Sequence, residues 1–230
     1  MAEFVIPAPT PASVAVQGNP ARFPVRRIFC VGRNYAEHAR EFGNDPDKEP
    51  PFFFTKPADA VIDNGFTLPY PSATNDLHFE GELVVAIGKG GANIPETAAL
   101  SHIWGYAPGN DLTRRDLQAT AKTMKRPWDM SKGFDRSAPC GALVPVATAG
   151  HPPADAVLTC TVNGAVKQKA KLADMIWPVP AIIAFLSQQV ELHPGDLIYT
   201  GTPAGVGALQ RGDSCEVSIT GLGSVTTSIA

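Results

Sequence analysis

The sequence has few cysteines and no close pair of them. Its four cysteines, among 230 residues, are Cys30, Cys140, Cys160 and Cys215. The absence of a Cys-x-x-Cys pair excludes the usual pattern of a thiolate metal site or a redox dithiol. Scattered cysteines favour reduced, structural thiols, which are typical of the cytosol. We therefore expect a cytoplasmic protein without disulfide bonds.

The sequence also lacks a charge surplus and a long apolar segment. Its formal net charge of −3 gives no electrostatic reason to expect nucleic acid or an anionic membrane as partner. No segment approaches the length of a membrane span, and residues 1–7 do not show the cationic and apolar regions of a signal peptide. With 44% hydrophobic residues, the chain fits one soluble, unexported domain with a full core.

The order of apolar runs and turn residues predicts a β-rich α+β domain. Residues 1–24 are rich in Pro, Ala and small polar residues and predict an extended arm, so we expect a single ordered domain over residues 25–230. Strands are expected at 27–31, 52–54, 83–87, 103–107, 157–162, 197–200 and 215–219, and helices at 35–42, 114–124 and 179–189. Such an excess of strands over helices argues against a regular βαβ succession.

Three acids in apolar or Gly-rich settings predict a metal site. Glu80 and Glu82 lie two residues apart at the start of the predicted strand 83–87, so their side chains point to the same face. Asp111 follows the predicted strand 103–107 and could supply a third oxygen. Carboxylates without a cysteine or histidine cluster suit Mg²⁺ or Mn²⁺, with Ca²⁺ as a substitute. Alternatively, the two glutamates are solvated edge residues and Asp111 caps a helix; His78, close to Glu80, could also be a ligand.

The predicted helix 35–42 contains a candidate general base. His38 and Glu41 are three residues apart and share one helical face, so the carboxylate can orient the imidazole and stabilise its cationic form. That arrangement suits the activation of water. The alternative is an ordinary surface pair.

Two glycine-rich segments resemble nucleotide-binding loops only superficially. Residues 88–91 lack the Walker spacing and predict a hairpin turn. Residues 201–207 follow the predicted strand 197–200 and lack the dinucleotide fingerprint. This second loop either places a hydroxyl and backbone N–H groups around a carboxylate or serves only to connect strands.

Six ordered motifs together resemble the fumarylacetoacetate hydrolase family, and within it the bacterial fumarylpyruvate hydrolases. They are Gly32-Arg33-Asn34-Tyr35-Ala36 with His38 and Glu41, Glu80-x-Glu82, residues 109–118, residues 132–135, residues 194–198 and Gly201-Thr202-Pro203. The resemblance covers roughly residues 4–225 and includes the amino-terminal arm. It implies a β-roll of mixed sheets with peripheral helices, usually a homodimer.

The resemblance also implies roles for individual residues. The expected ligands of Mg²⁺ or Mn²⁺ are Glu80, Glu82 and Asp111. His38 and Glu41 match the water-activating dyad, on a helix that behaves as a lid in relatives. Lys132 matches the lysine that faces the substrate, and the matching substrate-binding positions are Arg115, Gln118 and Thr202.

The implied reaction is hydrolysis of the carbon–carbon bond of a 2,4-dioxo acid, such as fumarylpyruvate to fumarate and pyruvate in gentisate breakdown. Alternatives are another acylpyruvate hydrolase, an oxaloacetate decarboxylase, a hydroxymuconate-type isomerase or decarboxylase, and a silent ligand-binding protein on the same scaffold. Fumarylpyruvate carries a second carboxylate, and we expect a cation to bind it. Arg33 and Lys56 are the candidates, although either could serve a structural ion pair instead.

Overall fold

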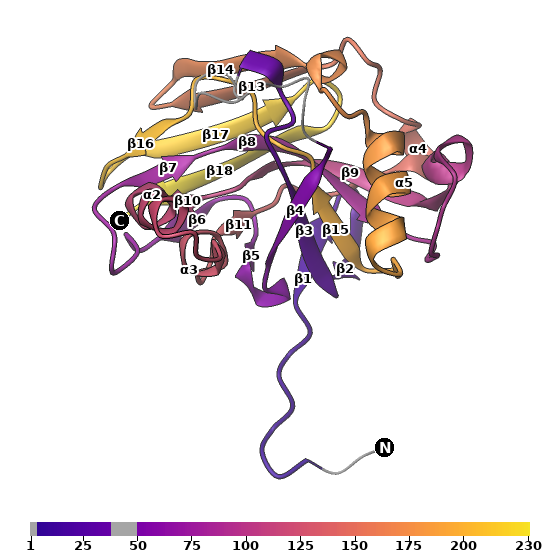
Figure 1. Ribbon diagram of the computed structural model, residues 1–230, viewed down its shortest axis with the longest axis horizontal. Coiled ribbons are helices and arrows are strands. Elements are labelled where there is room, and N and C mark those ends of the chain that lie inside the picture. The colour runs from indigo at the N-terminus through magenta and orange to yellow at the C-terminus, as the bar shows by residue number, and fades with distance from the viewer. Residues whose placement is uncertain (1–3, 38–49) are drawn as a thin grey trace.

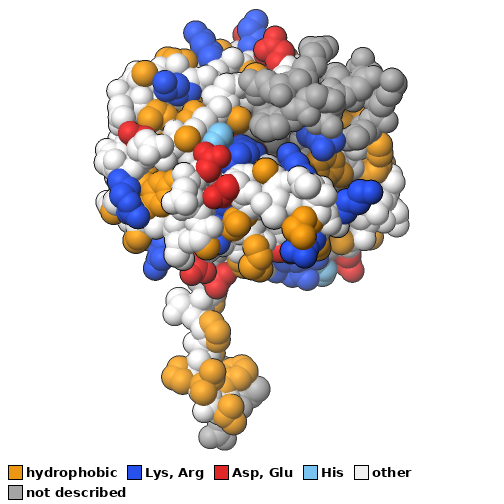
Figure 2. Space-filling view, turned by 60° about the vertical axis from the view of Figure 1, so that its left-hand side comes forward, with side chains coloured by type: hydrophobic (Ala, Val, Ile, Leu, Met, Phe, Trp, Pro, Cys, Tyr) orange, Lys and Arg blue, Asp and Glu red, His pale blue; other side chains and the backbone are white. Residues whose placement is uncertain are grey.

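The amino-terminal segment is only partly an arm. The structure is a computed structural model that describes residues 4–37 and 50–230. Residues 4–11 extend away from the body, and apolar side chains lie along them (Figures 1 and 2). Residues 13–24, which we expected to be extended as well, form the hairpin of β1 (Ser13–Val16) and β2 (Asn19–Pro24). Val14 and Val16 lie on one face of β1 and are buried with Phe23, which accounts for the difference.

A six-stranded mixed sheet forms the centre of the molecule (Figure 1). Its order is β12 (Val144–Pro145), β9 (Ile103–Asn110), β8 (Gly81–Ile87), β15 (Asp196–Tyr199), β3 (Arg27–Gly32) and β4 (Phe52–Lys56). β15 pairs parallel with β3 and antiparallel with β8. All seven residues of β8 are buried, because both faces of this sheet are covered. That explains why its sequence is continuously apolar rather than alternating.

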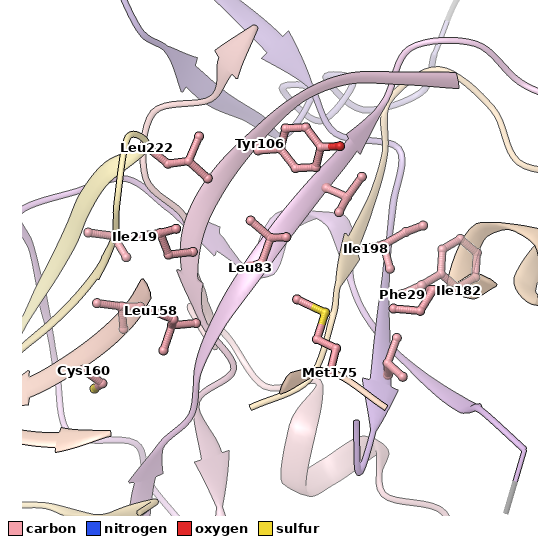
Figure 3. Packing of buried hydrophobic residues seen from close by; sticks show 14 of the residues in the cluster. Phe29, Leu83, Tyr106, Leu158, Cys160, Met175, Ile182, Ile198, Ile219 and Leu222 are labelled. Atoms are coloured by element: carbon pink, nitrogen blue, oxygen red, sulfur yellow. The ribbon is translucent and has the colours of Figure 1, made fainter. Parts of the chain in front are cut away.

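A second, five-stranded sheet packs on one face of the first. Its order is β14 (Ala165–Lys171), β13 (Val157–Val162), β17 (Ser214–Ile219), β18 (Gly223–Ile229) and β6 (Phe66–Leu68). Leu83 and Ile198 of the first sheet share a core with Leu158 and Ile219 of the second (Figure 3). Helix α5 (Val179–Gln189) adds Ile182 to that core. The opposite face of the six-stranded sheet is covered by the β1–β2 hairpin.

Short elements surround the two sheets. Three strands form a small sheet of order β10 (Thr113–Arg114), β7 (Leu77–Phe79) and β16 (Gly207–Leu209), and β5 (Val61–Ile62) pairs with β11 (Ala138–Pro139). Within the described ranges, the other helices are α2 (Arg115–Thr123), α3 (Asp129–Lys132), α4 (Val146–Ala149) and the 3₁₀ helices η1 (Ala58–Ala60), η2 (Glu96–His102) and η3 (Leu172–Asp174). No helix in the described part of the chain is long and apolar enough to cross a membrane.

The predicted fold class is confirmed as a β-rich α+β domain with several mixed sheets and peripheral helices. Each strand predicted within the described ranges is present, and β9 continues beyond the predicted end at 107 to Asn110. Helix α2 is one residue shorter at each end than the predicted 114–124. All four cysteines are free thiols and buried, as structural cysteines should be.

Candidate active site

The three predicted metal ligands come together at the ends of two neighbouring strands. Glu80 directly precedes β8 and Glu82 lies on it, while Asp111 directly follows β9. The antiparallel register pairs Gly81 with Asn110, and the Asp111 amide donates to the Glu80 carbonyl at 2.8 Å. One carboxylate oxygen from each acid lies within 4.8 Å of the others, and all three residues are buried. The predicted same-face geometry of the two glutamates is therefore confirmed.

Glu82 is the acid that most needs a cation. It is 1% exposed, and no described residue forms an ion pair with it. Its Oε2 accepts a hydrogen bond from the Gly201 amide at 2.7 Å. Burial, followed by the charges of Asp111 and Glu80, raises the pKa of Glu82 well above its usual value. Such a carboxylate is stabilised by a bound proton or by a metal ion.

The donor set fits a hard divalent cation. Three buried carboxylates converge without a described cysteine or histidine among them, which suits Mg²⁺ or Mn²⁺ rather than a softer ion. His78, the alternative ligand, is instead directed to Asp76, with its Nε2 2.9 Å from Asp76 Oδ1. The structure therefore supports the carboxylate-only site expected from the sequence.

Two buried lysines hold the acid cluster. Lys132 Nζ donates to Glu80 Oε2 at 2.7 Å and to Asp111 Oδ2 at 2.6 Å. Burial opposes the charge of Lys132, but Asp111 and Glu80 outweigh that effect and raise its pKa. Lys132 is thus a cation beside two of the three carboxylates.

Lys56 does not have the role considered for it as a ligand of the second substrate carboxylate. Its side chain is fully buried, and Nζ lies 2.8 Å from Asp111 Oδ1. Nζ also donates to the carbonyls of Leu112 and Lys132. Two hydrogen bonds and one ion pair therefore engage the ammonium group, so Lys56 positions Asp111 and the backbone at Lys132.

The residues predicted to bind substrate lie around the same acids. From helix α2, Arg115 Nη2 donates to Glu80 Oε1 at 2.5 Å, and Nη1 donates to Gln118 Oε1 at 2.7 Å. Thr202 Oγ1 donates to the Gly81 carbonyl at 3.0 Å. Loop 201–207 therefore places an N–H group around a carboxylate, as one interpretation held, but that carboxylate is Glu82 of the protein itself.

A cavity leads from the acids to the surface. It is lined by Val31, Gly32, Arg33, Phe52, Phe54, Glu80, Glu82, Arg115, Gln118, Lys122, Trp128, Lys132 and Thr202. Phe52 and Phe54 each lie against Trp128, with ring centroids 5.6 and 5.9 Å apart. One wall of the cavity is therefore aromatic, while its floor carries carboxylate and ammonium groups.

The predicted dyad of His38 and Glu41 lies outside the described residues, between Glu37 and residue 50. Its role therefore stays a prediction.

Three positioning residues escaped the sequence-based prediction. Asn110 Oδ1 accepts the Glu80 amide at 2.9 Å. Gln168, from the second sheet, accepts the Gly81 amide at 2.9 Å and donates to Thr202 Oγ1 at 2.8 Å. Asn34 donates to the Thr200 carbonyl at 2.8 Å, ahead of the 201–207 loop. Asn34 and Asn110 lie within two of the six motifs of the sequence, whereas no motif around Gln168 indicates its role.

This fold, with three converging carboxylates and a lysine at the base of a cavity, defines a metal-dependent enzyme of the fumarylacetoacetate hydrolase type. The family model described as fumarylacetoacetate (FAA) hydrolase C-terminal matches residues 27–230, and the chain belongs to this family.

Relatives within the family carry different names. The chain is 42% identical over 199 residues to "Oxaloacetate tautomerase FAHD1, mitochondrial" of Arabidopsis thaliana, covering 86% of this chain and 88% of that protein. It is 41% identical to "Fumarylpyruvate hydrolase" of Ralstonia sp over 80% of this chain and 95% of that protein. The crystal structure of fumarylpyruvate hydrolase from Pseudomonas aeruginosa in complex with Mn²⁺ and pyruvate superposes with a TM-score of 0.96, at 49% identity and covering 99% of both chains.

Proposed function

We propose that this protein hydrolyses the C3–C4 bond of a 2,4-dioxo acid and that fumarylpyruvate, giving fumarate and pyruvate, is its substrate. The observation that carries the proposal is the buried cluster of Glu80, Glu82 and Asp111 with Lys132 bonded to two of them. The likeness to fumarylpyruvate hydrolases of Ralstonia sp and Pseudomonas aeruginosa supports this choice of substrate.

A divalent cation held by Glu80, Glu82 and Asp111 supplies Lewis-acid polarisation of the 2-oxo acid end of the substrate. Lys132 adds a positive charge beside the same carboxylates, where it stabilises negative charge that develops on the pyruvoyl oxygens. The lysine needs no movement to do so, because Glu80 and Asp111 already hold its ammonium group.

Water is delivered, in this proposal, by His38 with the help of Glu41. The imidazole removes a proton from water as the oxygen adds to C4, and the C3–C4 bond then breaks. The electron pair of that bond moves to C3 as the pyruvate enolate, which takes a proton to give pyruvate. The role of the two residues rests on their spacing in the sequence and on the family resemblance, since both lie outside the described residues.

A second candidate is enolisation or decarboxylation of oxaloacetate, favoured by the Arabidopsis relative named as an oxaloacetate tautomerase. Both reactions use the same 2-oxo acid end, so the acid cluster does not distinguish them. The deciding experiment measures kcat/KM for fumarylpyruvate, acetylpyruvate and oxaloacetate with the same Mn²⁺ concentration. We expect fumarylpyruvate to give the highest value. Oxaloacetate as the best substrate, or no hydrolysis of either acylpyruvate, would overturn the proposal.

We also propose, from the family resemblance, that the chain is a cytoplasmic homodimer acting in aromatic-acid breakdown through gentisate. The exposed apolar side chains of the arm, Phe4, Val5 and Ile6, are consistent with a surface that a second copy covers. Light scattering on the purified protein measures the assembly directly. A monomer at micromolar concentration would contradict the dimer.

A further inference from the structure

Helix α2 presents a line of polar side chains to the cavity. Arg115, Gln118 and Lys122 stand at i, i+3 and i+7, which places them on one helical face, and all three line the cavity. Arg115 marks the inner end of this line, because its guanidinium donates to the metal ligand Glu80. Lys122 lies seven residues further along, roughly 10 Å down the helix axis at ~1.5 Å per residue.

The region around Lys122 combines positive charge with aromatic rings. Lys122 Nζ lies 5.1 Å from the ring centroid of Trp128, and Arg33 Cζ lies 5.3 Å from that of Phe52. The Phe52 and Trp128 rings are themselves in edge-to-face contact at 5.6 Å. Both cations therefore pack against the same pair of aromatic rings, and these rings also line the cavity.

The charges at this end of the cavity repel each other. Burial and then the neighbouring Arg115 and Arg33 lower the pKa of Lys122 to about 8. A carboxylate bound beside Lys122 favours the charged form of the lysine, whereas a neutral group does not. The inner end of the cavity differs, since its cations Lys132, Lys56 and Arg115 are all paired with Glu80 or Asp111.

The dimensions suit a substrate with a carboxylate at each end. In an extended 2,4-dioxo diacid of seven carbons, six bonds separate the two carboxyl carbons, which puts them roughly 7–8 Å apart for bonds of ~1.5 Å. The rise along the helix from Arg115 to Lys122 exceeds this span by about 3 Å. That difference equals the length of one hydrogen bond between a side chain and a carboxylate, ~3 Å. A planar, unsaturated tail of this length would lie along Phe52 and Trp128, where stacking is favourable.

We propose that Lys122, together with Arg33, binds the distal carboxylate of the substrate and so makes the enzyme selective for unsaturated diacids over acylpyruvates with a neutral tail. This inference rests on the proposed function and extends it, since it identifies the residues that recognise the acyl tail. Lys122 is a specificity-determining residue and takes no part in the bond-breaking step.

The test compares kcat/KM for fumarylpyruvate and acetylpyruvate in wild type, Lys122→Met and Lys122→Arg. A charge-assisted hydrogen bond contributes a factor of about 10–100, so Lys122→Met should lower the fumarylpyruvate-to-acetylpyruvate ratio by that factor. Methionine keeps an aliphatic chain against Trp128. Lys122→Arg should restore most of the ratio, because it keeps the charge. Lys125→Met, at an exposed position three residues further that does not line the cavity, is the matched control and should keep the wild-type ratio.

Direct binding of the product fumarate, measured by calorimetry, provides a readout that does not depend on turnover of a dioxo acid. The dissociation constant of fumarate should rise in Lys122→Met by the same factor and stay unchanged in Lys125→Met. An unaltered ratio in Lys122→Met, or an equal loss on both substrates, overturns this inference while leaving the hydrolase proposal intact. Failure of the wild type to hydrolyse either acylpyruvate instead overturns the proposed function itself.

Discussion

Replacing Glu82 by Gln should affect the stability of this protein differently in the metal-free and the metal-bound states. The side-chain volume is retained, and the amide oxygen can still accept the hydrogen bond from the Gly201 amide. In the metal-free protein the wild-type carboxylate is buried without an ion pair from any described residue, and its pKa is raised. Removing that carboxylate should therefore leave the metal-free melting temperature unchanged or higher.

The metal-bound state should respond in the opposite direction. At a Mn²⁺ concentration 100-fold above Kd, binding stabilises the wild type by about 2.7 kcal/mol. For a chain of 230 residues, this corresponds to a rise in Tm of roughly 5–10 °C. Glu82→Gln removes one of three carboxylate ligands, so its Mn²⁺-induced rise should fall below about 2 °C at the same concentration.

The assay is thermal denaturation in chelator and in Mn²⁺, followed by fluorescence or circular dichroism. Glu216→Gln, which changes an exposed acid on β17, is the matched control and should keep the full Mn²⁺-induced rise. A full rise in Glu82→Gln would refute the assignment of Glu82 as a ligand. A large drop in the metal-free Tm of Glu82→Gln would refute the argument that this buried carboxylate destabilises the metal-free protein.

Three further predictions concern other parts of the site. Lys56→Met should reduce the free energy of unfolding by about 3–5 kcal/mol in denaturant titrations, because it leaves Asp111 with a broken buried pair; an unchanged midpoint would contradict the positioning role. His38→Ala should lower kcat for fumarylpyruvate by about 10²–10⁴-fold with a smaller change in KM, and an unaltered kcat would remove His38 from the mechanism. The fumarylpyruvate-to-acetylpyruvate ratio of kcat/KM should fall as the pH is raised through about 8, since Lys122 is charged below its pKa and neutral above it. Lys122→Arg should show no such fall, and a ratio that is flat in the wild type would contradict the recognition role.

The position of the metal site follows from local sequence. The apolar run 83–87 predicts a buried strand, and strand periodicity then places Glu80 and Glu82 on one face. Asp111 was predicted as the third ligand because it follows another strand, and the antiparallel pairing of β8 with β9 does bring it beside Glu80. These inferences needed only the alternation of side chains and the preference of hard cations for oxygen.

The amino-terminal hairpin shows where composition misleads. Proline and alanine dominate residues 1–24, and such a segment is usually extended. The alternation of Val14 and Val16 is too short to stand out, and the hairpin is stabilised by burial against the six-stranded sheet rather than by its own propensity. Only the tertiary structure could show that a surface was available for it.

The residues that hold and extend the site come from distant parts of the chain. Gln168 binds the Gly81 amide across 87 positions, and a Cβ on Gly81 would lie only 3.2 Å from that Gln168 side chain. Lys56 was read as a possible substrate ligand, but the fold buries it against Asp111. The role proposed for Lys122 depends on the tertiary structure, because only the fold places α2 along the cavity. Local periodicity decides which face a side chain occupies, whereas the packing of the two sheets and α2 decides what that face meets.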